Sequence, residues 1–100
     1  MKTVQFTNAA RNDLKSIFTY SIRKWGRTQA QRYSDQLNAH VQKIAHSAAF
    51  SKPVNNSERN LMQSATGRHL IIFEQTDEQI LIVRVLHEAM DIPRHISPSH

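Results

Sequence analysis

The chain contains no cysteine, so the sequence excludes disulfide bonds, thiolate nucleophiles and cysteine-ligated zinc or iron-sulfur centres. It has only two glycines, Gly26 and Gly67, which are too few for a glycine-rich phosphate-binding loop. None of its apolar runs is long enough to cross a bilayer, and residues 2–6 do not resemble the apolar stretch of a signal peptide. We therefore expect a cytoplasmic protein that does not associate with membranes.

Acidic residues are scarce in the first half of the chain. The 100 residues carry a formal charge of +5 and are 39% hydrophobic, which suits one domain with a single core. Residues 1–50 contain eight Lys or Arg against two Asp, giving +6, whereas residues 51–100 contain five against six, giving −1. A basic half suits an anionic partner, either nucleic acid or an acidic polypeptide. Helix surfaces that use Lys and Arg for solubility would produce the same imbalance.

The first part of the chain predicts a short strand followed by a helix. Residues 2–6 alternate apolar and polar side chains, and Thr7 or Asn8 can cap the helix that follows. From Ala9 the apolar residues repeat every three or four positions. Gly26 should end this helix, because glycine accepts the left-handed conformation of a helix C-cap. The apolar stripe consists of Ala10, Leu14, Ile17, Phe18, Ser21, Ile22 and Trp25.

A second helix is predicted after Gly26, with Thr28 as its cap. Its apolar positions are Ala30, Tyr33, Leu37, Val41 and Ile44. Because only a few residues separate the two helices, they should form an antiparallel hairpin. Each helix has one apolar stripe, and a sheet built from the rest of the chain is the expected cover.

The second half predicts three strands. Residues 47–60 read as a loop, because Pro53 and its polar neighbours exclude a long regular element. Residues 60–65, 68–75 and 79–87 read as strands joined by short turns, so consecutive strands should pair antiparallel. The predicted fold is therefore α+β.

In this fold an N-terminal strand and an antiparallel helical hairpin pack on a mainly antiparallel sheet in the order β-α-α-β-β-β, with a short C-terminal tail. The single domain should span residues 1–96, and residues 97–100 should be a frayed tail.

The last two predicted strands are apolar on both faces. In residues 68–75, Leu70 and Ile72 lie opposite Ile71 and Phe73. In residues 79–87 one face should carry Ile80, Ile82 and Leu86, and the other Leu81, Val83 and Val85. One helical hairpin covers one face. The other face must be closed by the tail, by self-association or by a partner protein.

Arg68 and Arg84 are the candidates for chemistry, because they fall in strands made otherwise of apolar residues, where an unpaired charge is costly. Either they line a site for an anion, or they pair with carboxylates. The carboxylates considered are Glu74, Glu88 and Asp91. In a nuclease, arginine would stabilise phosphate charge and His87 would act as general acid or base.

No metal site and no serine nucleophile is expected. His87, Asp91 and His95 are spaced by four, which would place metal-ligand types on one face of a helix. Pro93 lies inside that span and argues against a regular helix. None of the serines lies in a G-x-S-x-G motif.

Five segments together carry a resemblance to a known family. They are residues 9–17, Trp25-Gly26, and residues 29–33, 67–73 and 83–95. The last of them resembles the pattern LHxxMDxxRH almost residue for residue. The chain resembles the small toxins of bacterial toxin-antitoxin modules, the RelE/ParE superfamily, and the ParE branch is the closer match.

The resemblance implies a toxin that traps DNA gyrase, so that replication stalls, and that is neutralised by a cognate antitoxin with an acidic, amphipathic segment. It implies no catalytic residue, no cofactor and no sequence-specific binding of nucleic acid. The residues expected to contact the antitoxin or the target are Arg68, Phe73, Arg84, Leu86, His87, Met90, Arg94 and His95.

The RelE branch of the same superfamily provides the alternative function, because its members cleave messenger RNA on the ribosome. They use basic residues and commonly a terminal tyrosine, whereas this chain has no tyrosine after Tyr33. An endoribonuclease site would have to be rebuilt from Arg68, Arg84 and His87. A third possibility is an inactive relative that is retained only for binding its antitoxin.

Overall fold

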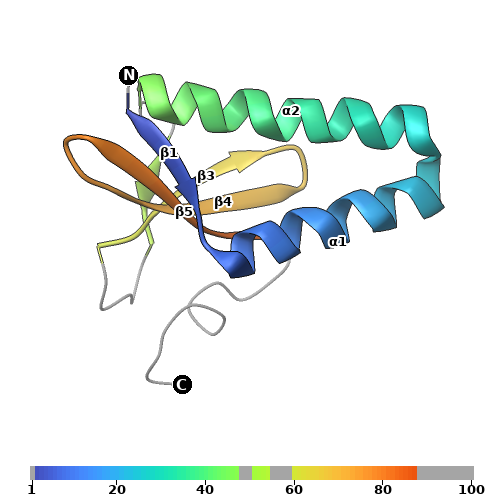
Figure 1. Ribbon diagram of the computed structural model, residues 1–100, viewed down its shortest axis with the longest axis horizontal. Coiled ribbons are helices and arrows are strands. Elements are labelled where there is room, and N and C mark those ends of the chain that lie inside the picture. The colour runs from blue at the N-terminus through green and yellow to red at the C-terminus, as the bar shows by residue number, and fades with distance from the viewer. Residues whose placement is uncertain (1, 48–50, 55–59, 88–100) are drawn as a thin grey trace.

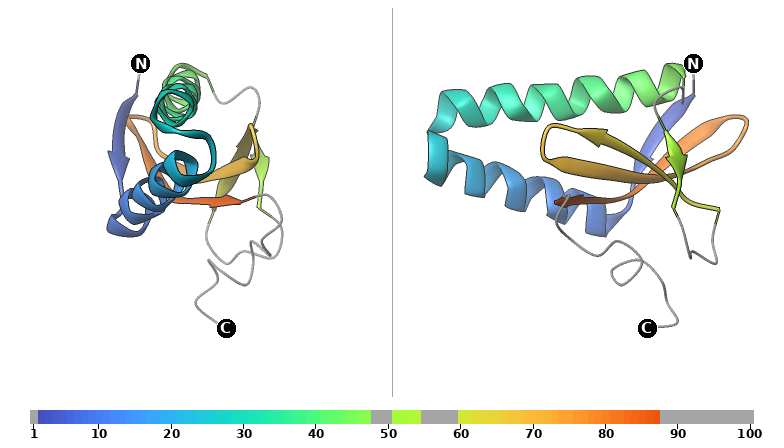
Figure 2. Two further views of the ribbon diagram at one scale, coloured as in Figure 1. Left: turned by 90° about the vertical axis from the view of Figure 1, so that its right-hand side faces the viewer. Right: turned by 180° about the vertical axis from the view of Figure 1, so that it is seen from behind.

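The computed structural model describes residues 2–47, 51–54 and 60–87. Along the chain lie β1 (Thr3–Phe6), α1 (Asn8–Trp25), α2 (Arg27–His46), β2 (Lys52–Pro53), β3 (Met62–Thr66), β4 (His69–Gln75) and β5 (Gln79–His87). The five strands form one sheet in the order β1-β5-β4-β3-β2. Only β1 and β5 pair in parallel, and the other neighbours are antiparallel. Both helices lie on one side of this sheet, which confirms the predicted α+β fold (Figures 1 and 2).

Two details differ from the sequence prediction. The predicted loop contains strand β2, which pairs with β3 at the edge of the sheet, where Pro53 needs no ladder hydrogen bond of its own. Helix α2 begins at Arg27, so Thr28 is not its cap. Gly26 alone separates the helices: its N–H donates to the Ile22 carbonyl and its carbonyl accepts from the N–H of Ala30. Its φ of 87° and ψ of 168° fall in a region open essentially to glycine, rather than in the predicted left-handed helical region.

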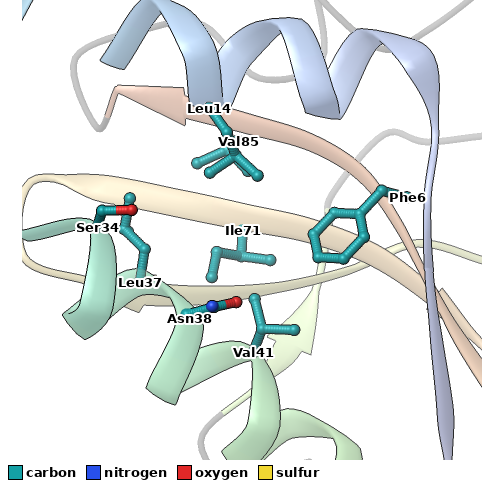
Figure 3. A pocket seen from close by; sticks show the side chains of 8 residues that line it. All are labelled: Phe6, Leu14, Ser34, Leu37, Asn38, Val41, Ile71 and Val85. Atoms are coloured by element: carbon teal, nitrogen blue, oxygen red, sulfur yellow. The ribbon is translucent and has the colours of Figure 1, made fainter. Parts of the chain in front are cut away.

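The main core lies between the helices and the sheet. Its buried members are Ala10, Val41, Ile44, Ile71, Phe73, Ile80, Ile82 and Val85. The two helices diverge from Gly26 as they cross the sheet (Figure 1). They leave a cavity of about 140 Å³ between them, lined by apolar residues from both helices and the sheet together with Ser34 and Asn38 (Figure 3).

A β-bulge in β5 changes which side chains reach this core. Ile72 pairs with Arg84 but Phe73 pairs with Ile82, so Val83 is one extra residue in β5. The extra residue shifts the alternation of side chains by one position. As a result Val85 packs in the helix-facing core and Leu86 on the opposite face, which is the reverse of the predicted assignment.

The start of α1 is fastened to this bulge. The Thr7 hydroxyl donates to the Val83 carbonyl at 2.7 Å and accepts from the Ala10 N–H at 3.0 Å, so one side chain caps the helix and joins it to β5. Thr7 also donates its backbone N–H to the Ile82 carbonyl at 3.0 Å. The helix therefore begins at a position fixed by the strand.

Asp13, one turn further along α1, completes the attachment. One carboxylate oxygen accepts from Arg84 Nε at 2.7 Å and from the Val85 N–H at 2.9 Å, and the other accepts from Arg84 Nη2 at 2.9 Å. The hydrogen bonds to Asp13 raise the pKa of the Arg84 guanidinium, while burial acts in the opposite direction. Pairing of Arg84 with a carboxylate was one of the two alternatives left open by the sequence, and the partner is Asp13 rather than one of the three carboxylates considered.

The sheet face opposite the helices is closed in part by the chain itself. Ile72 and Leu86 are 0% and 1% exposed, and the described residues that pack with them include Val54 and Leu61. The Val54 N–H donates to the Leu61 carbonyl at 3.0 Å, which holds these two residues together. The three alternatives considered were the tail, self-association and a partner protein, but at these positions the face is covered by Val54 and Leu61 of the chain itself.

A polar contact joins α2 to β3. His40 Nε2 and the Ser64 hydroxyl are 2.7 Å apart, and Ser64 is only 2% exposed. Burial, and secondarily the nearby Lys43 charge, lower the pKa of His40 below its ordinary value of 6.5. The neutral imidazole is thus the form that the fold favours.

Replacing Asp13 tests the attachment of α1 to β5. Asp13→Ala removes three hydrogen bonds and leaves the Arg84 guanidinium without this partner, so we expect the free energy of unfolding to fall by about 2–4 kcal/mol. The control is Asp35→Ala, because Asp35 is exposed and accepts one side-chain hydrogen bond from Gln31. This control should cost less than about 0.5 kcal/mol. Urea denaturation of both variants measures the difference, and equal losses would contradict the role of Asp13.

His40 should make the stability depend on pH. Its folded-state pKa lies below its unfolded value of 6.5, so its contribution is fully present above that value and is lost as the pH falls through the folded pKa. We expect urea denaturation to show a loss of stability between about pH 7 and pH 5. His40→Gln keeps an amide that can reach Ser64 but does not titrate, and it should lose less stability over that interval. Parallel curves for the two proteins would assign the pH dependence to other groups.

Candidate functional site

A groove runs between the end of the helical hairpin that contains Gly26 and the adjacent ends of strands β3, β4 and β5. We call it the hairpin groove, and its volume is about 810 Å³. The hairpin extends past the turn between β3 and β4, so its closed end does not lie over the sheet (Figure 1). Helix α1 contributes Ser16, Ile17, Tyr20, Ser21, Lys24 and Trp25. The other walls are formed by Gln29, Tyr33 and Gln36 of α2, and by Gly67, Arg68, His69 and His87 at the ends of strands.

Aromatic side chains stand exposed at one end of the groove. Tyr20 and Trp25 are 57% and 52% exposed, although Trp25 belongs to the predicted apolar stripe of α1. Their rings meet edge to face, with centroids 6.1 Å apart and planes at 87°. Lys24 Nζ lies 5.8 Å from the centroid of the Tyr20 ring, within the range of a cation–π contact. These rings stay exposed because the helices extend past the end of the sheet (Figure 1).

Tyr33, His69 and His87 gather where α2 meets the ends of β4 and β5. The Tyr33 hydroxyl lies 2.5 Å from His69 Nδ1 and accepts the backbone N–H of Arg68 at 3.1 Å. The Tyr33 O–H can donate to Nδ1 when the proton of His69 is on Nε2. His69 and His87 are paired across the ladder, and their rings meet edge to face at 5.6 Å.

Gly67 makes room for this cluster. A Cβ at this position would lie 2.7 Å from both Cε1 and the hydroxyl of Tyr33, closer than side chains tolerate. Gly67 also has a φ of +56°, which a turn between two strands reaches most easily with glycine. The absent side chain therefore lets the Tyr33 ring lie against the turn between β3 and β4.

The groove is electropositive. The described residues that line it include the cations Lys24 and Arg68 and the two imidazoles of His69 and His87, and none of these described residues is Asp or Glu. Aromatic faces, cations and imidazoles in one concave surface can stack on a flat ring, bind an anion and exchange protons.

The residues predicted as contacts are divided among several places. Arg68 and His87 both line the hairpin groove, with Arg68 exposed on the turn before β4 rather than inside a strand. Arg84 is hydrogen-bonded to Asp13 on α1 and is not one of the residues that line the groove. The suggested nuclease set of Arg68, Arg84 and His87 therefore does not come together in this groove.

Two further predicted contacts are core residues. Phe73 is 0% exposed between the helices and the sheet, and Leu86 is 1% exposed on the other face. Neither can reach a partner while the chain keeps this fold, because other side chains of the chain cover both. Met90, Arg94 and His95 lie outside the described residues, as do residues 97–100 of the predicted tail.

Sequence reasoning missed Tyr20, Tyr33 and His69 as site residues. Tyr33 was assigned to the apolar stripe of α2, yet its hydroxyl needs a polar partner in a half-buried position, which is a signal available from residue type alone. His69 is the first residue of β4, so its side chain lies at the end of the strand and not among the central residues of the sheet. Tyr20 falls outside the apolar stripe of α1, and nothing in the helical pattern singles it out.

Among the described residues, no group of three or more His, Cys, Asp or Glu side chains is placed to hold a metal ion. Of His87, Asp91 and His95, from whose spacing no metal site was expected, only His87 lies within those residues. Neither α1 nor α2 is both long and apolar enough to cross a membrane.

Comparison with known proteins identifies relatives along nearly the whole chain. The sequence model of the family described as "ParE toxin of type II toxin-antitoxin system, parDE" matches residues 4–92. Toxin ParE1 of Caulobacter vibrioides is 32% identical over 96 residues, which are 96% of this chain and 99% of that protein. Toxin ParE of Escherichia coli is 29% identical over 87 residues, which are 86% of this chain and 84% of that protein.

Solved structures share the fold. A chain of the chromosomal ParDE TA system from P. aeruginosa superposes with a TM-score of 0.73 at 16% identity, covering 87% of this chain and 96% of that chain. A chain of the E. coli DinJ-YafQ toxin-antitoxin complex gives a TM-score of 0.60 at 12% identity, covering 88% and 93%. The family match and the similarity to the Caulobacter toxin along its length confirm the resemblance read from the sequence, and this chain belongs to the ParE toxin family of type II toxin-antitoxin systems, within the RelE/ParE superfamily.

Proposed function

We propose that this toxin inhibits DNA gyrase, thereby blocking replication, and that its cognate antitoxin neutralises it by direct binding. Gyrase as the target would place this action in the cytoplasm. The proposal describes a protein that binds its target and does not turn over a substrate.

The observation that carries this proposal is the position of Arg84. Its guanidinium makes two hydrogen bonds to Asp13 of α1, and Val85 beside it donates its backbone N–H to the same carboxylate. An arginine that holds a helix to a strand is not available to stabilise a phosphate in a reaction. This supports a structural role for Arg84. It also supports a function in which the toxin binds its target through its surface and does not catalyse a reaction.

Binding of an antitoxin is supported by the charge of the helices and by the relatives. Helices α1 and α2 carry seven Lys or Arg and only two Asp, and one of those Asp residues is paired with Arg84. An acidic segment of a partner would therefore meet a basic surface. The solved structures with this fold include chains from toxin-antitoxin complexes.

Endoribonuclease activity is the second candidate, and one observation favours it. Tyr33, His69 and His87 lie together in the hairpin groove with Arg68 beside them. One imidazole could take the proton of a ribose 2′-hydroxyl as that hydroxyl attacks the phosphate. The other imidazole, in its protonated form, could give a proton to the leaving 5′-oxygen. Arg68 would then stabilise the charge that develops on the phosphate.

The purified toxin should be added to a gyrase supercoiling assay and to a ribosome-bound messenger RNA cleavage assay. We expect supercoiling to stop while the messenger RNA stays intact, because the target is gyrase and Arg84 is committed to the fold. Prior mixing with the antitoxin encoded beside the toxin gene should restore supercoiling. Expression of the toxin alone should arrest growth, and co-expression should relieve the arrest.

Cleaved messenger RNA with unaffected gyrase would replace this proposal with the endoribonuclease. In that case His87→Ala should slow cleavage by about 100-fold or more, because a general acid or base contributes at least that factor. Continued growth on expression of the toxin alone, with both assays negative, would identify an inactive relative that retains only antitoxin binding.

A further inference from the structure

We propose that the hairpin groove binds a nucleoside phosphate, with the base against the aromatic rings of Tyr20 and Trp25 and the phosphate against Arg68. This would be a binding activity separate from gyrase inhibition, and it requires no cleavage of RNA. It rests on the size of the groove, on its two chemically different ends and on the absence of carboxylates among the described residues that line it.

The dimensions of the groove suit such a ligand. Its volume of about 810 Å³ falls within the range of about 300–1,000 Å³ that is usual for small-molecule sites. On α1 the lining runs from Ser16 to Trp25, which at the helical rise per residue is about 13 to 14 Å. A base, a sugar and a phosphate arranged end to end fit along a groove of this length.

The aromatic end offers surfaces for stacking. Tyr20 and Trp25 are the exposed large hydrophobic side chains of the described residues. In their edge-to-face arrangement, the ring that contributes its edge has both faces uncovered by the other ring. A nucleobase can stack on such a face whatever its sequence identity, because every base has a flat π surface. Lys24 beside Tyr20 adds a positive charge at this end of the groove.

The other end offers groups that bind phosphate. Arg68 is exposed, and its backbone is held in place by the hydrogen bond from its N–H to the Tyr33 hydroxyl at 3.1 Å. A guanidinium binds phosphate oxygens with paired hydrogen bonds, and His87 lines the same end of the groove. None of the described residues that line the groove is an Asp or Glu that would repel the anion.

A nucleoside phosphate fits this combination better than an acidic peptide does. Carboxylates of a peptide would satisfy Arg68 and Lys24, but they have no flat surface to place on the exposed rings. A nucleoside phosphate supplies a flat ring and an anion in one molecule, at opposite ends. The source could be a free nucleotide or the phosphorylated end of a nucleic acid strand.

Trp25 is the only tryptophan of the chain, so its fluorescence reports on the groove alone. The full-length toxin should be titrated at physiological salt with adenosine monophosphate, adenosine and inorganic phosphate, with N-acetyltryptophanamide as a control for absorption by the base. We expect adenosine monophosphate to change the emission saturably. Adenosine and phosphate, which each fill one end, should bind at least about tenfold more weakly.

Matched variants locate the two ends of the ligand. Arg68→Gln should weaken binding of adenosine monophosphate about tenfold or more and leave adenosine unchanged. Arg32→Gln is the control, since Arg32 is an exposed arginine of α2 that does not line the groove. Tyr20→Ala should weaken both ligands about tenfold, because it removes a stacking surface. Circular dichroism and thermal unfolding will show whether each variant keeps the fold.

Several results would overturn the proposal. These are no saturable change with adenosine monophosphate, equal binding of inorganic phosphate, equal losses in Arg68→Gln and Arg32→Gln, or competition by tetraglutamate at the same concentration as the nucleotide. A 5′-phosphorylated dinucleotide distinguishes the two sources. Binding more than about tenfold tighter than that of the mononucleotide would support the end of a strand, and equal binding would support a free nucleotide. Gyrase and ribosomes are absent from these titrations, so their outcome is independent of the proposed function.

Discussion

The carboxylate of Asp13 joins the helical layer to the sheet, and much of the structure depends on it. Its two oxygens accept three hydrogen bonds from Arg84 and Val85, at the point where the bulge interrupts the regular ladder of β5. A bulge leaves backbone groups of the strand without their usual partners, and here a side chain of α1 takes one of them. The same interaction uses the charge of Arg84, which therefore belongs to the framework of the protein and not to its surface.

The hairpin groove follows from how the helices are placed by this attachment. Because the start of α1 is fixed at β5, its C-terminal part extends past the sheet, and the single residue Gly26 connects it to α2 (Figure 1). Tyr20 and Trp25 stay exposed for that reason. The Tyr33 ring of α2 contacts the turn between β3 and β4, where Gly67 has no side chain and leaves room for it. One side of the hairpin groove is therefore the part of the helices that the sheet leaves uncovered. On the other side, the Tyr33 hydroxyl holds Arg68 and His69 in place.

The distribution of the predicted contact residues shows why apolar strands and binding surfaces are difficult to distinguish in a sequence. Phe73 and Leu86 are apolar residues of central strands, and both are buried by the chain itself. Ile72 on the second face packs with Val54, which comes from the segment predicted as a loop, and with Leu61, which comes from the first of the three predicted strands. An apolar side chain from a loop can help to cover a sheet face, but no periodic pattern in the sequence indicates it. The exposed aromatic residues lie instead on the helices, where the periodic pattern predicted burial for Trp25.

The sequence by itself determined the helices, four of the five strands, their order and the family, because hydrophobic periodicity, turn residues and the segments shared with ParE toxins are local features of the chain. Predicting the antiparallel pairing of β3, β4 and β5 needed only short connections between strands. Only the tertiary structure decided that β1 lies parallel to β5, that Asp13 pairs with Arg84, and that Tyr33 meets His69. These contacts join residues more than thirty positions apart, and one extra residue at a bulge exchanges the faces of Val85 and Leu86. Local patterns do not encode such contacts, since they arise from the way whole layers pack.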